Sequence, residues 1–393
     1  MGVQVRVGAD ALAALEAAPS QFDVDRSERF GPGPHAAETA SALPSPGWLF
    51  DAWCRWEPGI TPVAVVVPSD REPGGDIVVP LGIRRRFGFV ELVAAGHPVV
   101  DLVRWAGAAR TPDAVASGIV RALHTAGPRA SLRLEQVAAD EAWIPALAAA
   151  LGRRPTPGQS VAATRLGDDR DPTLVAGRNF RRKARQVERR IVADGHALEV
   201  ASIVDLGELV AALRSVDGLR SERDSAAGRR TPFDGGPGSG ALRTSIRSAA
   251  QRGELELVTV SVDGELVAYN LTVIEASVVR VIDGRVSPHW RATALGVVAD
   301  LAVVTSACAV PTIEWIDWGR GVNSNKARLA TDIVETVDIN GWNSPIAGVL
   351  GPGLRAARRR AQHGLAEHPH LQDAWRQAKR RISRPGTRGS DSS

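Results

Sequence analysis

The chain has 393 residues, of which 44% are hydrophobic and 23% are charged, a composition that excludes disorder throughout and supplies enough apolar side chains for a large core. At about 100 to 200 residues per domain, this length predicts two domains or one fold in two halves. The formal net charge is only +4 but the isoelectric point is about 9.6, which indicates clustered basic residues that either bind phosphates or carboxylates or are simply solvated.

The N-terminal stretch is predicted to be irregular. Residues 1–40 are rich in Ala, Gly and Pro, and the run GPGPH at 31–35 is typical of chain without regular structure, so we expect a loosely packed leader over 1–40. Asp10 and Glu16 interrupt the apolar residues near the N-terminus and no basic segment precedes them. The stretch therefore does not resemble a secretory signal, and we expect the protein in the cytoplasm.

Two further features concern the compartment. Cys54 and Cys308 stand far apart, with no CxxC pair and no neighbouring His, which is typical of buried thiols in a reducing compartment and not of a disulfide framework or a zinc site. The longest apolar run, Ala292–Val310, carries Asp300 at its centre. This argues against a membrane span and favours a helix buried inside the protein.

The first half, 41–165, is predicted to mix helices and strands. Pro62–Pro68 and Asp76–Ile83 are β-branched runs separated by a turn rich in Pro, Gly and Asp, which is typical of two paired strands. Helical periodicity and strand-like alternation then predict a helix, a strand and a second helix, at 113–125, 131–137 and 140–151. The segment 152–172, rich in Gly, Pro, Asp and Arg, is the expected boundary.

The second half, 175–345, is predicted to open with three helices. The helix at 177–191 crowds seven basic residues into a few turns: Arg178, Arg181, Arg182, Lys183, Arg185, Arg189 and Arg190. Helices at 205–221 and 241–252 follow, separated by a Gly-rich loop at 222–240. Basic residues predominate again in 351–393, where we expect a basic helix and then a disordered tail.

Strands dominate the rest of the second half. Glu254–Val262 and Glu265–Ile274 alternate and are joined by Asp263-Gly264, a strong short-range signal for a hairpin. A strand, the buried helix, and two more strands are predicted in that order, at 278–286, 292–310, 312–318 and 334–340. Because the helix lies between two apolar strands, we expect these strands to be parallel neighbours through a right-handed crossover.

The common catalytic signatures are absent from the sequence. There is no P-loop, no GxGxxG after a strand, no GxSxG elbow and no HExxH, and the eight His residues lack the spacing of metal ligands. The sequence therefore predicts neither a metal site nor dinucleotide or serine-hydrolase chemistry.

The start of the predicted buried helix is a candidate anion site. Ser287 would cap the helix and Pro288 suits its first turn, which leaves backbone N–H groups at the positive end of the helix dipole. Arg291 adds a charge and Gly296 permits a ligand or a neighbouring backbone to come close. The alternative is that Ser287 and Pro288 merely begin a helix.

A second candidate feature follows the next strand. Asp317, Arg320 and Lys326 lie at or just beyond its carboxyl end, and in such sheets ligands bind outside the carboxyl ends of parallel strands. We therefore expect one cleft between these residues and the helix start. The alternative is that Asp317 pairs with Arg320 or Lys326 and only braces a Gly-rich turn.

The order of elements resembles the GNAT acyltransferase fold, and in detail its CelD/BcsL-type and FemAB-like branch, in which two GNAT-like halves lie in one chain. The similar segments are NFRRKARQVERRI, the hairpin GELELVTVSVDGELVAYNLTV, VRVIDGRVSPHW and WIDWGRGVNSNKAR. This branch usually shows Asp-Phe-Gly-x-Gly and then Tyr-Lys, whereas this chain has Asp317-Trp318-Gly319-Arg320-Gly321 and then Asn325-Lys326. The resemblance implies an α/β fold of two tandem GNAT-like halves, each a mixed sheet flanked by helices.

The resemblance also implies an activity, the transfer of an acyl group from acyl-CoA, most simply acetyl-CoA, to an amine of a small molecule or of a cell-envelope or polysaccharide precursor. Acyl-CoA would be a co-substrate, with no tightly bound cofactor. Its pyrophosphate would lie at the helix start, on Ser287, Pro288, His289, Trp290, Arg291 and Gly296. Asp317 would orient the attacking amine or relay its proton, with Asp283 as a second candidate, and Arg320 or Lys326 would stabilise charge.

Two other activities fit the same resemblance. One is FemAB-like transfer of an aminoacyl group from transfer RNA, and the other is a GNAT-fold protein that binds ligands without catalysis, for which Asn325 in place of Tyr is the support. The basic helix at 177–191 leaves three interpretations open, a solvated face, a face for an anionic substrate, or a nucleic-acid surface. Phe180 is its only aromatic residue, which does not favour nucleic acid.

Overall fold

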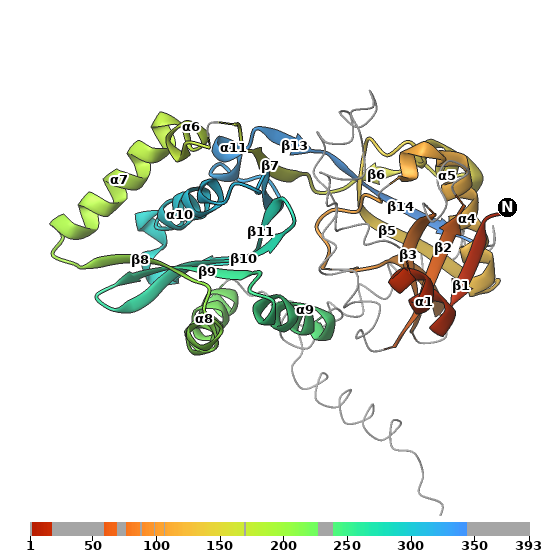
Figure 1. Cartoon of the computed structure of the whole chain (residues 1–393), viewed down its shortest axis with the longest axis horizontal. Helices are drawn as coiled ribbons and strands as arrows, with labels where there is room; N and C mark the ends of the chain where they lie inside the picture. Colours follow the sequence, from red (N-terminus) through yellow and green to blue (C-terminus); the bar gives the residue numbers. More distant parts are fainter. Residues whose placement is uncertain are drawn as a thin grey trace, which may run out of the picture.

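We describe a computed structural model of the chain, over residues 2–17, 59–68, 76–86, 89–97, 99–105, 107–168, 170–226 and 239–343. Two seven-stranded mixed sheets lie side by side, and each is flanked by helices (Figure 1). The predicted fold class, two α/β halves, is confirmed. Within these residues no helix is long and apolar enough to cross a membrane.

The first sheet has the order β1-β2-β3-β4-β5-β14-β6. Its strands are β1 (Gln4–Val7), β2 (Ile60–Val67), β3 (Ile77–Arg86), β4 (Phe89–Ala94), β5 (Ala130–Ala138), β14 (Thr336–Trp342) and β6 (Thr156–Pro157). The helices are α1 (Ala9–Ala17), α4 (Pro112–Ala126) and α5 (Ile144–Leu151). β4 and β5 run parallel on either side of α4 in the sequence. Val65, Leu81 and Ile119 lie in a large buried cluster that also includes Leu209, Leu255 and Val273 of the second half.

The second sheet has the order β13-β7-β12-β11-β10-β9-β8. Its strands are β13 (Asp332–Val334), β7 (Val161–Arg165), β12 (Trp315–Arg320), β11 (Val278–Val286), β10 (Glu265–Glu275), β9 (Leu255–Val262) and β8 (Leu198–Ile203). The helices are α6 (Pro172–Val175), α7 (Gly177–Ala193), α8 (Leu206–Ala226), α9 (Ser239–Gln251), α10 (Gly296–Ala309) and α11 (Lys326–Leu329). β9 and β10 form the predicted hairpin, and Asp263 and Gly264 both have positive φ, as its tight turn requires.

The predicted parallel pair is confirmed. β11 and β12 pair in parallel through Val278, Val279 and Arg280, and α10 connects them. Val297, Val303 and Val304 of α10 are buried against the sheet, as expected for a mostly apolar helix whose one charged residue is Asp300. Cys308 in this helix is buried, as predicted, whereas Cys54 lies outside the described residues.

Two boundaries drawn from the sequence are corrected by strand pairing. Residues 161–165, which the sequence places in the boundary segment 152–172 at the end of the first half and without a strand, form β7, and β7 pairs with β12 and β13 of the second sheet. The last predicted strand of the second half is β14, which pairs with β5 and β6 of the first sheet. Local patterns show that a strand forms but not which sheet accepts it, because pairing partners are chosen by contacts that are distant in sequence.

The predicted leader also needs correction. Residues 4–17, expected to be irregular, form β1 and α1, and β1 pairs antiparallel with β2. Ala11 and Ala14 of α1 are buried against β2 and β3 in a small cluster with Ala64, Val66 and Val78. Small side chains thus pack closely where composition had suggested loose chain. The remainder of the leader and the basic segment 351–393 lie outside the described residues.

Within the described residues the chain passes between the sheets twice, and the two connections lie side by side. One is Gly158–Ser160, between β6 and β7, and the other is the single residue Glu335, between β13 and β14. Gly158 N donates to Thr336 O at 2.8 Å, Thr336 Oγ1 donates to Gln159 O at 2.9 Å, and Ser160 Oγ donates to Glu335 Oε2 at 2.9 Å. We call these residues the double crossing.

Gly158 is the position in the double crossing where a side chain does not fit. A Cβ there would lie 2.4 Å from Thr336 Oγ1 and 3.0 Å from Gln136 Nε2. We expect Gly158→Ala to lower the free energy of unfolding by about 1 to 2 kcal/mol, because the buried hydroxyl of Thr336 would have to leave its hydrogen bonds. Urea denaturation measures this change. Gly167→Ala is the matched control, since a Cβ added to Gly167 would have no atom within 4 Å, and equal stability of the two variants would contradict the prediction.

Candidate functional site

The second sheet opens at the carboxyl ends of β11 and β12. The two strands pair over Val278–Arg280 and Trp315–Asp317 only, and no ladder pair joins them further on within the described residues. A bulge in β11 at Ile282, between Val281 and Asp283 in the register with β10, turns this strand. Gly319 and Gly321, with φ of 72° and 78°, turn β12 and the chain after it. The polar loop therefore begins where the sheet splits.

Lys326 lies at this split. Its Nζ donates to Arg320 O at 3.1 Å, which folds the loop 321–326 back onto the end of β12. The side chain is largely buried, and this burial lowers the pKa of Lys326, with Asp101, Asp317 and Asp300 opposing the shift. The cation is thus held in a partly dry position beside three carboxylates.

Asp300 approaches the same place from α10. Asn270 of β10 donates from Nδ2 to Asp300 Oδ1 at 3.0 Å, and burial raises the pKa of Asp300 to about 6. A carboxyl group with this pKa changes its protonation state near neutral pH. The sequence carried a signal for this residue, since it is the one charged side chain in an apolar helix, but nothing local related it to Lys326.

Asp317 is placed differently from its expected role. It is buried, and it accepts hydrogen bonds from Arg280 Nη1 at 2.7 Å and from the Gly319 backbone N–H at 2.8 Å. Arg280 is also buried and pairs with Glu275 at 2.9 Å. Burial raises the pKa of Asp317, while the Arg280 charge opposes this. The alternative interpretation, in which Asp317 braces the turn, matches this geometry, although its partner is Arg280 and not Arg320 or Lys326.

Arg320 joins the two halves. Its Nε donates to Asp101 Oδ1 at 2.5 Å and its Nη2 donates to Val100 O at 2.8 Å. Asp101 follows β4 in the first half, and its other carboxylate oxygen lies so close to Gly319 that a Cβ there would be 2.8 Å away. The first half therefore supplies a half-exposed carboxylate to the split between β11 and β12. No motif in the sequence indicated Asp101.

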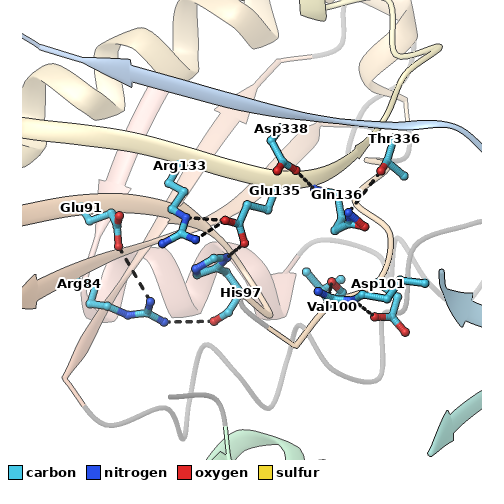
Figure 2. A network of polar contacts seen from close by, with 11 residues as sticks. Arg84, Glu91, His97, Val100, Asp101, Arg133, Glu135, Gln136, Thr336 and Asp338 are labelled. Atoms are coloured by element: carbon cyan, nitrogen blue, oxygen red, sulfur yellow. Dashed lines mark hydrogen bonds and ion pairs between the residues drawn. The ribbon is translucent and has the colours of Figure 1, made fainter. Parts of the chain in front are cut away.

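A polar network in the first half fixes the segment that carries Asp101 (Figure 2). His97 Nδ1 lies 3.3 Å from Glu135 Oε2, and Arg84 Nη2 donates to His97 O at 3.1 Å. Arg133 Nε donates to Glu135 Oε1 at 2.6 Å. Burial, aided by the nearby charges of Arg133, Arg84 and Arg320, lowers the pKa of His97 to about 3. His97 is therefore neutral at physiological pH, and its hydrogen bonds hold the segment that leads to Asp101 in place.

Asp283 belongs to a separate buried cluster on the face of the sheet covered by α8. Tyr269 Oη donates to Asp283 Oδ2 at 2.6 Å, and Arg285 Nη1 donates to Asp283 Oδ1 at 2.6 Å. Arg285 also pairs with Asp224 of α8 at 3.1 Å. Burial, together with the Asp283 charge, raises the pKa of Tyr269, so the phenol stays protonated. Asp283 and Lys326 thus lie in different hydrogen-bonding groups.

The predicted helix start is only partly correct. Ser287 is buried and its side chain makes no cap hydrogen bond, and Pro288–Thr293 form a short 3₁₀ helix. α10 begins at Gly296, because Ala294 adopts a left-handed conformation that interrupts the helical chain. A Cβ on Gly296 would lie 3.3 Å from Val286 Cγ2, so α10 starts in close contact with the end of β11.

The other residues of this segment lie on the surface. His289 is 83% exposed and its Nε2 lies 3.3 Å from Glu222 Oε1, while Trp290 meets His196 edge to face. Arg291 is exposed. An anion at the start of α10 would therefore meet the backbone of Gly296 and the exposed side chain of an arginine, but not the Ser287 hydroxyl.

Comparisons with known proteins agree with this architecture. The family profile described as an acetyltransferase (GNAT) domain matches residues 178–327. The solved structure of FemX is similar, with a TM-score of 0.55 and 12% identity, over 82% of this chain and 98% of that one. The C-terminal (DUF2156) domain of a candidate lysylphosphatidylglycerol synthetase from Agrobacterium fabrum is similar at a TM-score of 0.50 and 14% identity, over 78% of this chain and 89% of that one. No curated protein matches the sequence.

The buried pair of Asp317 and Arg280 yields a stability prediction. Asp317→Asn would remove the charge that pairs with the buried Arg280 guanidinium, so we expect the free energy of unfolding to fall by about 2 to 4 kcal/mol. Urea denaturation measures the change. Asp332→Asn, at an exposed position in β13, serves as the control and should change stability by about 0.5 kcal/mol or less. If both variants lose the same free energy of unfolding, the buried ion pair does not stabilise the fold more than an exposed carboxylate does.

Proposed function

We propose that the chain, whose residues 178–327 match the acetyltransferase (GNAT) domain profile, is an acyl-CoA-dependent N-acyltransferase with acetyl-CoA as the simplest donor. The acceptor would be an amine of a small molecule or of a cell-envelope or polysaccharide precursor. The observation that carries this proposal is the split between β11 and β12, with the start of α10 on one side and Lys326, Arg320 and Asp101 at its end. A thioester laid into the split would bring its carbonyl group to these residues.

The donor would be held chiefly by backbone groups. From Ala294 onward, the first backbone N–H that bonds back along the chain is that of Val297, which donates to Ala294 O at 3.0 Å. The N–H groups of Leu295 and Gly296 come before it, at the positive end of the α10 dipole, and we assign them to the coenzyme A pyrophosphate. Arg291 supplies an exposed charge next to them. The remaining residues of the segment form the surface around these groups, and we assign them no direct contact with the pyrophosphate: Ser287, Pro288, His289 and Trp290.

The chemistry would be direct attack of the amine on the thioester. The amine nitrogen bonds to the carbonyl carbon, the carbon–sulfur bond breaks, and the amine proton passes to a carboxylate while the thiolate takes up a proton. Asp101 is half-exposed and oriented by Arg320, so we propose that its carboxylate accepts the amine proton. Lys326, a cation in a partly dry site, would stabilise the negative charge that develops on the carbonyl oxygen or the sulfur.

The two aspartates expected from the sequence take other roles in this proposal. Asp317 positions the end of β12 through Arg280 and the Gly319 N–H. Asp283, with Tyr269 and Arg285, lies on the α8 face of the sheet, and we assign this cluster to the acceptor side of the site. The first half then contributes Asp101 and the network that holds it.

Binding of the donor tests the proposal directly. We expect acetyl-CoA or a longer acyl-CoA to bind in isothermal titration, and Arg291→Ala to weaken binding by about threefold to fivefold, because an exposed ion pair contributes up to about 1 kcal/mol. Arg129→Ala, an exposed arginine of the first half, should leave the affinity unchanged. If no acyl-CoA gives binding heat and aminoacylated transfer RNA binds, the proposed acyl-CoA donor is wrong and the donor is an aminoacyl-tRNA.

Lys326 gives a second test. We expect Lys326→Met to lower the rate of thiol release from acetyl-CoA, measured with a panel of primary amines, by about 100-fold or more, because the lost cation acts on charge that develops in a water-poor site. Lys183→Met is the control, since it removes the same group from α7, where Nζ only reaches Asn325 Oδ1 at 3.5 Å. If Lys326→Met retains the normal rate, the assignment of Lys326 is wrong.

A further inference from the structure

The outward face of α7 carries a straight row of arginines. Arg178, Arg182, Arg185 and Arg189 are separated by four, three and four residues, so they lie above one another on one side of the helix. All four side chains are exposed. We call this row the arginine stripe. At about 1.5 Å per residue it extends over roughly 17 Å.

The inner face of α7 fixes the direction of the stripe. Phe180, Ala184, Val187 and Ile191 are buried and pack with side chains of α10 such as Val303 and Val298. At about 100° per residue these four positions lie opposite the stripe. Figure 1 shows α7 along the outer edge of the second half, so the stripe faces away from the sheet.

The charges of the stripe are not neutralised within the described chain. α7 holds seven basic residues and one acidic residue, Glu188. Among the described residues, the ion pair that α7 forms with its surroundings is Arg190 with Asp194, at 3.8 Å, and Arg190 is outside the stripe. A rigid helix that presents four parallel guanidinium groups is suited to a surface with many phosphates, because each guanidinium can bind a phosphate through two hydrogen bonds.

Two exposed apolar side chains indicate what kind of phosphate surface this is. Val192, three residues beyond Arg189, continues the stripe and is 62% exposed, and Leu174, just before α7, is 66% exposed. The single aromatic residue of α7, Phe180, is buried, so the helix offers no ring on which a base could stack. Apolar side chains that flank a basic row suit the boundary between phosphate headgroups and acyl chains.

We propose that the arginine stripe docks the protein onto an anionic lipid surface. α7 would lie parallel to that surface, with the arginines on lipid phosphates and with Leu174 and Val192 dipping toward the acyl chains. The inner face of the helix stays packed on α10, so docking needs no unfolding. The stripe lies on the opposite side of α7 from the sheet, so docking leaves the split between β11 and β12 uncovered.

Vesicle co-sedimentation of the full chain tests this inference. Vesicles of phosphatidylcholine with a share of roughly 30% phosphatidylglycerol would be compared with pure phosphatidylcholine, at low and at physiological salt. We expect binding to the anionic vesicles only. The double variant Arg185→Glu with Arg189→Glu should weaken the partition coefficient by about tenfold or more, since each basic residue near the surface contributes on the order of a fivefold gain.

The matched control is Arg129→Glu with Arg154→Glu, two exposed arginines of the first half, which should bind as the wild type does. Arg185→Gln with Arg189→Gln repeats the test with the charges removed instead of reversed, and circular dichroism checks that each variant is folded. Val192→Asp should also weaken binding. The inference is overturned if anionic vesicles do not bind, if the stripe variants bind normally, or if a duplex RNA binds through the stripe and vesicles do not.

Discussion

The double crossing is the constraint on which the architecture depends. Each sheet contains a strand delivered by the other part of the chain, β7 in the second sheet and β14 in the first, and the connecting residues hydrogen-bond to one another at Gly158, Ser160 and Glu335. Two short connections that bond to each other limit how far the halves can move apart, since separation would break the hydrogen bonds of the double crossing. This fixed arrangement is what lets a residue of the first half, Asp101, take a defined place at the end of β12.

The two halves repeat one motif but use it differently. In each, two parallel strands are joined by a helix, β4 and β5 by α4, and β11 and β12 by α10. In the first half, Val103 bridges to Val137 in parallel beyond the last ladder pair, so chain fills the space where the strands would part. In the second half the strands part at Asp317. The open strand ends of the second half are the place that we propose for a thioester, while the first half supplies the segment around His97 and Asp101.

The sequence predicted what local patterns determine. Alternation and Asp263-Gly264 identified the hairpin, and the apolar run around Asp300 identified a buried helix between parallel strands. The position of Lys326 at a strand end followed from the same reasoning. The sequence could not predict that Arg280 would take Asp317 as its partner, because this depends on the register between β11 and β12. It could not predict Asp101 beside Arg320, because two halves must meet to form that contact.

The double crossing also has a consequence for how the protein is made. The strand that completes the first sheet, β14, is among the last described residues to leave the ribosome, and β7 lies between β12 and β13, which are synthesised long after it. Until β14 is synthesised, the β5 edge of the first sheet has no partner strand. An unpaired edge of this kind is a site for wrong pairing and aggregation. Pairings between segments so distant in sequence form slowly. We therefore expect the double crossing to form late and slowly as the chain folds.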